Sequence, residues 1–189
     1  MLLALGGAIG LVAGLLTGGN LRNLLERRLR WPLVVIGALV VRELEIRTPV
    51  GSAAWGPAIF ALSLALLMVW AAWHHDRLPG IWLVVLGIGM NLLVVLVNGG
   101  RMPVAVAAAH LAPAELREQG TFAQYALAGP DTRLGWLGDW IVLPPPIGWL
   151  FPQAYSPGDI VSLAGFAVVM FLATRPDSRS TRRRVITTP

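Results

Sequence analysis

Long stretches without charge are the feature that most constrains how this chain can fold. A helix needs about 20 mostly apolar residues to cross the hydrocarbon core of a bilayer. Candidate segments lie at residues 2–18, 32–46, 55–73, 81–97 and 160–174. With 56% hydrophobic and 13% charged residues, the chain is also more apolar than an ordinary soluble domain. We therefore predict an all-α integral membrane protein, a bundle of about five transmembrane helices in a single membrane domain at 1–175.

These segments differ in how well they suit a bilayer. Segments 55–73 and 81–97 are long and almost wholly apolar, whereas the uncharged core of the second ends at Val41, so the extent of that span stays open. The last has fifteen uncharged residues, about 22 Å of helix against a core of about 30 Å. The first has no preceding basic residue and no small-residue cleavage pattern, so we expect a retained helix rather than a cleaved signal peptide.

The basic residues favour one orientation, because positively charged flanks stay on the cytoplasmic side. All fifteen are arginine, and five spans divide them ten to five. The ten are Arg22, Arg27, Arg28, Arg30, Arg77, Arg175, Arg179, Arg182, Arg183 and Arg184, and the five are Arg42, Arg47, Arg101, Arg117 and Arg133. This bias predicts an amino terminus outside and a carboxyl terminus in the cytoplasm.

Two arginine clusters border the spans. Residues 20–30 place leucines on one helical face and arginines elsewhere, which is typical of an interfacial helix on anionic lipid headgroups. The alternative is a docking site for a cytoplasmic partner. We expect 176–189 to be a basic, disordered cytoplasmic tail. Neither cluster is interleaved with base-stacking aromatic residues, so we expect no nucleic acid as a partner.

The segment at 99–158 lies on the predicted outer side. Its proline and glycine residues, including three consecutive prolines at 144–146, exclude a regular spanning helix. We predict an irregular Pro/Gly-rich loop on the outer leaflet, and whether 141–152 re-enters the bilayer stays open. A short surface helix is expected at 113–119, ended by Gly120.

A glycine recurs every four residues in the first segment. Gly6, Gly10, Gly14 and Gly18 therefore share one helix face, which permits close helix approach in a membrane. We favour a partner helix in the same chain, because a five-helix bundle needs tight seams. The other interpretation is a partner in another copy or in a larger membrane complex.

Polar residues in and after the fourth segment are candidates for a ligand site. Asn91 and Asn98 are seven residues apart and share a helix face, and a carboxamide in lipid must find a partner. We interpret Asn91 as an interhelical hydrogen-bonding residue that sets the helix register. For the run Asn98, Gly99, Gly100 and Arg101 two interpretations stand: a helix C-cap with a snorkelling arginine, or one wall of an outward-facing polar pocket.

Charged residues further along the chain are candidates for the opposite wall. They are Asp131, Arg133, Asp139 and Asp159. Asp159 also suits the start of a helix, which is its simpler role, and we expect Asp139 to pair with Arg101. We predict no catalytic nucleophile and no cofactor. Cysteine is absent and the histidines at 74 and 75 lack further ligands, so we predict no metal site.

Three motifs in combination resemble a known family. They are Asn-Gly-Gly-Arg-Met-Pro at 98–103, Asp-Thr-Arg at 131–133 leading to Leu-Gly-Asp at 137–139, and Ser-Pro-Gly-Asp at 156–159. Together they resemble a bacterial family of small multi-pass membrane proteins known only as a domain of unknown function, over residues 2–174. The resemblance implies an integral fold in the bacterial plasma (inner) membrane and brings no reaction or ligand. Arg42 departs from the pattern, where an uncharged polar residue is expected.

These patterns lead to one leading hypothesis and two others. We interpret the chain as a multi-pass membrane protein, more consistent with a non-enzymatic role, that binds or transports a small polar or lipid-derived ligand at the outward-facing site. The alternative is a structural or accessory subunit of a larger membrane complex, or a homo-oligomer, that associates through the glycine stripe. An enzyme acting on lipid-linked substrates is the third hypothesis.

Overall fold

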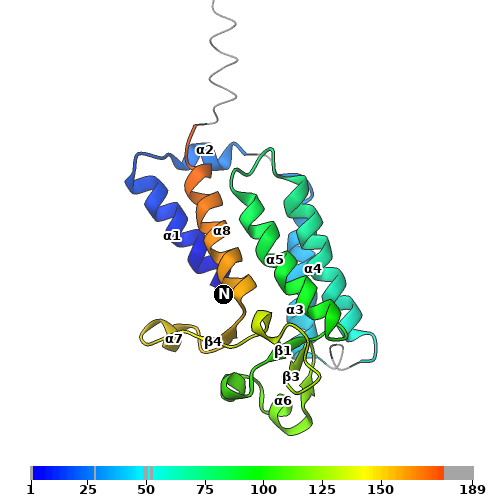
Figure 1. The fold of residues 1–189 in the computed structure, drawn as a ribbon. Coiled ribbons are helices and arrows are strands. Elements are labelled where there is room, and N and C mark those ends of the chain that lie inside the picture. Colours follow the sequence, from blue (N-terminus) through cyan, green and yellow to red (C-terminus); the bar gives the residue numbers. More distant parts are fainter. Residues whose placement is uncertain (1, 28, 49–50, 52, 177–189) are drawn as a thin grey trace, which may run out of the picture.

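Five long helices lie side by side and dominate the fold (Figure 1). The computed structural model describes residues 2–27, 29–48, 51 and 53–176. The long helices are α1 (Leu2–Leu16), α3 (Pro32–Arg47), α4 (Gly56–Trp73), α5 (Ile81–Val97) and α8 (Pro157–Ala173). Each falls on one of the apolar stretches identified in the sequence, so the described part of the chain is mostly helical. The basic tail predicted at its carboxyl end lies, from residue 177 on, outside the described residues.

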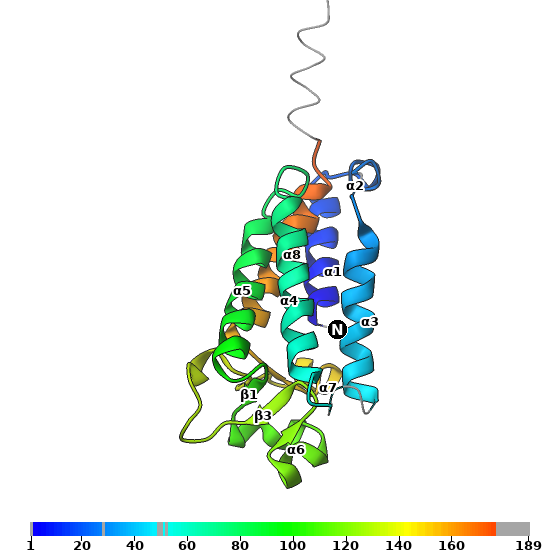
Figure 2. The ribbon, with the colours of Figure 1, turned by 90° about the vertical axis from the view of Figure 1, so that its right-hand side faces the viewer.

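The packing order of these helices differs from their order in the chain. Helix α8 lies between α1 and α5, α5 packs against α4, and α4 packs against α3. Helix α3 therefore lies at an edge of the bundle, as Figure 2 shows. Buried apolar side chains form two clusters, one around Phe60 and Val94 and the other around Ala71 and Val169. Many large apolar side chains on the outer faces of the helices are exposed.

Glycines allow a close contact between α1 and α8. Gly6 and Gly10 of α1 face the backbone of α8 at Leu163 and Ala167, where a Cβ atom would overlap carbonyl oxygens. An added Cβ at Gly14 would overlap the side chain of Thr174, just after the end of α8. Gly18 differs, because it has a φ of 86° and no neighbour within 4 Å of an added Cβ, and it lies after the last residue of α1. The first three glycines thus lie in a seam within the chain, as small residues in close helix contacts do.

Residues 99–156 form a cap at one end of the bundle. The prediction of an all-α chain with an irregular loop is wrong here, because the cap contains two small sheets. One has the strand order β1 (Met102–Val104), β3 (Tyr125–Leu127) and β2 (Thr121–Phe122), with β1 parallel and β2 antiparallel to β3. The other pairs β4 (Ile141–Val142) with β5 (Ala154–Tyr155). Strands of two or three residues satisfy backbone groups but are too short to produce a readable periodicity.

Short helices complete the cap. They are the 3₁₀ helices η1 (Val106–Leu111) and η2 (Gly135–Leu137) and the α-helices α6 (Ala114–Gln119) and α7 (Ile147–Leu150). Helix α6 ends at Gly120, which has a φ of 74°, as the sequence indicates for the surface helix.

The opposite end of the bundle carries α2 (Leu21–Leu25) and the turn between α4 and α5. The interfacial helix predicted over 20–30 is thus only five residues long. Arg27 donates hydrogen bonds to the carbonyl oxygens of Arg77, Ala173 and Leu172, and so joins this turn to the end of α8. The buried His74 accepts a hydrogen bond from the backbone N–H of Arg30. Arginine here binds helix-end carbonyls, which lack partners within their helices.

Length and composition allow one described helix, α4, to cross a membrane by the usual criterion of 18 residues. Helices α1, α5 and α8 are apolar but shorter.

Candidate functional site

Asn98 attaches the cap to the end of α5. Its side-chain Nδ2 donates to the carbonyl oxygens of Val94, at 2.7 Å, and of Arg133, at 2.8 Å, while its Oδ1 accepts from the backbone N–H of Arg133 at 2.9 Å. The carboxamide therefore pairs with the backbone of Arg133 as a neighbouring strand would. Both of its donors are used, so Asn98 positions the cap and has little capacity left for a ligand.

Asn91 is joined to the start of α8. Its Nδ2 donates to Oδ1 of Asp159 at 2.9 Å, and its Oδ1 accepts from the hydroxyl of Ser156 at 2.8 Å. Ser156 and Asp159 also form a reciprocal capping box at the first turn of α8. Asn91 and Asp159 thus take part in a hydrogen-bond network between α5 and α8. Gly87 and Gly158 lie beside this network, where there is no room for a Cβ atom between the two helices.

Ser156 was noted in the sequence as part of the Ser-Pro-Gly-Asp motif, but its role as the N-cap of α8 was not predicted, although a signal for it exists. The run Ser-Pro-Gly-Asp places an N-cap serine three residues before a carboxylate, with proline in the first turn. That spacing is the pattern of a capping box.

Gly99 and Gly100 turn the chain from α5 into β1. Their φ values are 69° and 85°, in the left-handed region that glycine adopts at no steric cost. Gly100 also lies against Pro57 at the start of α4, where an added Cβ would meet backbone atoms. These two glycines place Arg101 between the bundle and the cap. The guanidinium Nε of Arg101 is buried there and has no hydrogen-bond partner.

Asp139 is held beside β1 by its backbone. Its N–H donates to the carbonyl of Pro103 at 2.8 Å, and its carbonyl accepts from the N–H of Ala105 at 2.9 Å. The residue is 7% exposed. Ion pairs between described residues join Arg22 to Glu26, Arg47 to Glu43 and His75 to Asp76.

Gln124 is a buried polar residue that sequence reasoning missed. It is 1% exposed, and neither Oε1 nor Nε2 of its side chain has a hydrogen-bond partner. Its backbone carbonyl accepts from the N–H of Met102 at 2.7 Å, so Gln124 lies directly beside the residue that follows Arg101. A lone glutamine among the apolar residues of 121–128 is a weak signal, because exposed and buried positions in so short a segment look alike.

The end of α3 also reaches this region. Glu45 is fully buried, and its backbone contacts Gly51, where an added Cβ would lie 2.9 Å from the Cβ of Ala123. We use the term junction cluster for Glu45, Arg101, Gln124 and Asp139, four residues with buried polar side-chain atoms near the end of α3 and in or beside β1 and β3. Asp131 and the side chain of Arg133 are exposed and lie outside it.

The profile of a family of unknown function, DUF5317, matches residues 26–171, which is more than half of the chain. The chain belongs to this family. The match includes α3 to α5, the whole cap and most of α8, whereas α1 and α2 precede it. The chain matches no curated protein and no solved structure.

Membership of DUF5317 confirms the predicted relation to a family of unknown function and adds no activity. Every member of the junction cluster lies within the matched residues. The glycine stripe of α1 lies before them. In this chain the family region therefore contains the junction cluster and Asn98 and Asn91, which position the cap and α8.

Proposed function

We propose that this member of DUF5317 is a bacterial plasma-membrane protein with five transmembrane helices that binds a small polar or lipid-derived ligand at the junction cluster. Transport of that ligand is the wider form of the same proposal. The observation that carries it is the side chain of Gln124, which is buried with both polar atoms unpartnered, while its backbone carbonyl lies against Met102, the residue after Arg101.

The outer faces of the helices support a membrane location. Leu62, Leu66 and Val69 of α4 are all about half exposed, as are Leu86, Leu93 and Leu96 of α5. In water such a continuous apolar surface would be unfavourable, whereas lipid chains cover it without cost. Helix α1 begins near the cap and α8 ends at the far end with Arg27 and Arg77, so the arginine bias favours an outer position for the cap.

Gln124 and Arg101 support binding at the junction cluster because their buried side-chain atoms need partners. An unsatisfied buried polar atom costs about 1–3 kcal/mol, and native proteins keep few of them. Gln124 offers an acceptor at Oε1 and two donors at Nε2, and Arg101 offers a donor at Nε. A ligand that carries a hydroxyl group beside an anionic acceptor would satisfy all of these atoms. Polyol phosphates and phospholipid headgroups both have this chemistry.

Binding is tested on the full chain purified in detergent and in lipid nanodiscs. The free probe is glycerol 3-phosphate and the lipid probe is phosphatidylglycerol, each titrated while the unfolding temperature is recorded. We expect stabilisation by one of them that Gln124→Leu removes and Gln119→Leu, on the exposed face of α6, retains. Equal stabilisation of the wild type and Gln124→Leu would disprove the site.

The side of the membrane on which the cap lies is tested separately with single-cysteine variants, because the native chain has no cysteine. A membrane-impermeant reagent applied to intact cells should label Glu118→Cys in the cap and should not label Arg22→Cys at the far end. Labelling at Arg22→Cys but not at Glu118→Cys would refute the orientation.

A structural or accessory subunit is the second candidate function, with the exposed face of α3 rather than the glycine stripe of α1 as the interface. The glycines of α1 are covered by α8, but α3 packs mainly against α4 and exposes Leu33 and Ile36. Gly37 of α3 has no neighbour within 4 Å of an added Cβ. Loss of a co-purifying membrane partner in Gly37→Leu, with the fold retained, would favour this role over ligand binding.

A further inference from the structure

The segment from β4 through α7 to β5 forms a hairpin that projects sideways from the cap (Figure 1). Its tip is apolar and exposed: Trp149 is 75% and Leu150 is 70% exposed. The tip lies on the side of the cap below α1 and α8 in Figure 1, level with the end of the bundle. These side chains therefore face outward at the place where a membrane-embedded bundle would meet the headgroup region.

The hairpin has a defined shape. Ile141 and Val142 pair with Tyr155 and Ala154, and the backbone N–H of Trp140 donates to the carbonyl of Tyr155. Gly148 donates to the carbonyl of Pro144, and Phe151 donates to that of Ile147. Exposure of the tip is thus a property of a hydrogen-bonded structure.

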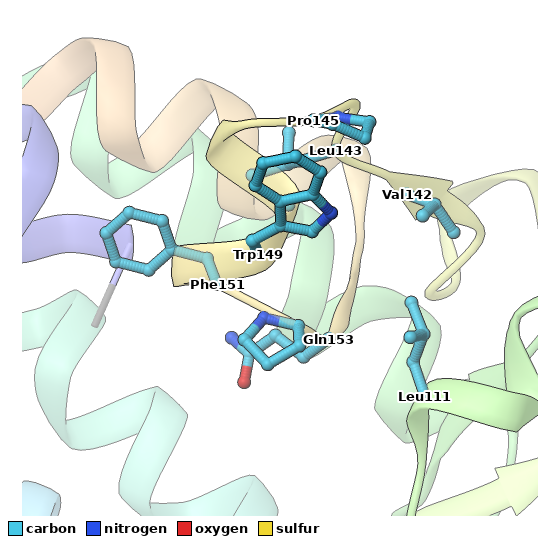
Figure 3. Close-up of a pocket in the computed structure, with 9 residues that line it drawn as sticks. Leu111, Val142, Leu143, Pro145, Trp149, Phe151 and Gln153 are labelled. Carbon is cyan, nitrogen blue, oxygen red and sulfur yellow. The ribbon is translucent and has the colours of Figure 1, made fainter.

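A pocket of about 220 Å³ lies between this hairpin and η1. Figure 3 shows Leu111 and Val142 on one side of it and Trp149 and Phe151 on the other. The lining residues are Leu111, Val142, Leu143, Pro145, Gly148, Trp149, Phe151, Pro152 and Gln153. Sites for whole small molecules have volumes of about 300–1,000 Å³, so this pocket suits one apolar part of a larger molecule.

The absence of charged residues from the hairpin limits which molecules can occupy the pocket. No charged residue occurs between Asp139 and Asp159, so the hairpin offers no ion-pair partner to a headgroup. The aromatic ring of Trp149, with its apolar body and single N–H, suits the boundary between headgroups and acyl chains. The carboxyl-terminal segment of the chain is a poor occupant, because it is rich in arginine and follows the end of α8 that lies opposite the cap.

We propose that the hairpin lies in the outer leaflet and that its pocket holds part of one acyl chain of a bilayer phospholipid. This inference rests on the proposed membrane location and is independent of the junction cluster. It goes beyond that proposal because it assigns a lipid-chain site to residues of the cap.

The test uses the full chain in nanodiscs of phosphatidylcholine with a nitroxide on the acyl chain. Single cysteines carry a fluorophore at Leu150 on the hairpin tip, at Leu66 on the outer face of α4, and at Glu118 on α6. We expect the nitroxide to quench the probes at 150 and 66 at least twofold more than the probe at 118.

The pocket is tested by Leu111→Trp, which fills it, against Val106→Trp on the exposed face of η1. In detergent, Leu111→Trp should lose a co-purified phospholipid that Val106→Trp retains, as measured by native mass spectrometry.

Each other outcome overturns the inference. Quenching at 66 without quenching at 150 leaves the membrane location standing and removes the hairpin from the leaflet. Absence of quenching at both positions refutes the membrane location and the inference together. Equal lipid retention by Leu111→Trp and Val106→Trp excludes an acyl chain as the occupant of the pocket.

Discussion

Substitution of Gly10 by alanine should separate α1 from α8. The added Cβ would lie 2.7 Å from the carbonyl carbon and 2.8 Å from the Cα of Ala167, and these are backbone atoms of α8. Ordinary van der Waals contact between carbon atoms needs about 3.5–4.0 Å, so the helices must move apart by about 1 Å. Because α1 packs mainly against α8, this movement weakens most of its contact with the bundle.

The expected loss is about 2 kcal/mol in the free energy of unfolding. Overpacking costs about 1–3 kcal/mol, and a backbone neighbour that cannot rotate away places Gly10→Ala near the upper value. The gain in helix propensity from glycine to alanine offsets up to about 1 kcal/mol of it. Gly37→Ala is the matched control, because that helix position has open space around it. It should stabilise the protein by about 0.5–1 kcal/mol.

The assay is unfolding of both variants in mixed micelles with a rising fraction of dodecyl sulfate, followed by far-UV circular dichroism. The difference in unfolding free energy between Gly37→Ala and Gly10→Ala should reach about 3 kcal/mol. Equal unfolding free energies would refute the close contact of α1 with α8. They would also restore the interpretation that the glycine stripe serves a partner outside the chain.

Three further predictions concern the cap and its attachment. Asn98→Ala removes the hydrogen bonds to both backbone groups of Arg133. Hydrogen exchange measured by mass spectrometry should therefore be at least tenfold faster at the Arg133 amide. Unchanged exchange would contradict the role of Asn98 in holding the cap. Ser156→Ala removes the N-cap of α8 and a partner of Asn91, and should lower the unfolding free energy by about 1–2 kcal/mol. The control Thr121→Ala, at an exposed position, should lower the unfolding free energy far less. Burial raises the pKa of the Tyr155 hydroxyl above its ordinary value of 10.0, against a smaller lowering by Gln153, and the folded state thus holds this proton more tightly than the unfolded state. Stability from this group is present below pH 10 and lost as pH rises above it, so unfolding measured against pH should show a steeper alkaline decline in the wild type than in Tyr155→Phe.

The helices of this chain could be predicted from local patterns. Apolar runs ended by proline, glycine or charge marked α4 and α5 closely, and Gly120 marked the end of α6. The roles of Asp159 at a helix start and of Asn91 between helices also follow from residue type and position. In each case the decisive physics acts within a few residues along the chain.

The candidate site was less predictable. Asn98 was recognised as polar and capping, but its partner Arg133 lies 35 residues away and is bound through its backbone. Gln124 carries the proposed site, and its burial depends on the packing of β3 against β1. The strands of the cap are too short to produce a pattern, and their pairing satisfies backbone groups that become buried only when the cap folds.

Residue type at fixed spacing was enough to predict the helical segments, the glycine face of α1 and the division of the arginines between the two ends. Packing of the whole chain was needed to show that α8 lies between α1 and α5, that the glycines of α1 contact the backbone of α8, and that the side chain of Gln124 is buried. Contacts between residues far apart in the chain depend on shape and hydrogen-bond complementarity, and these exist only when the elements are packed together.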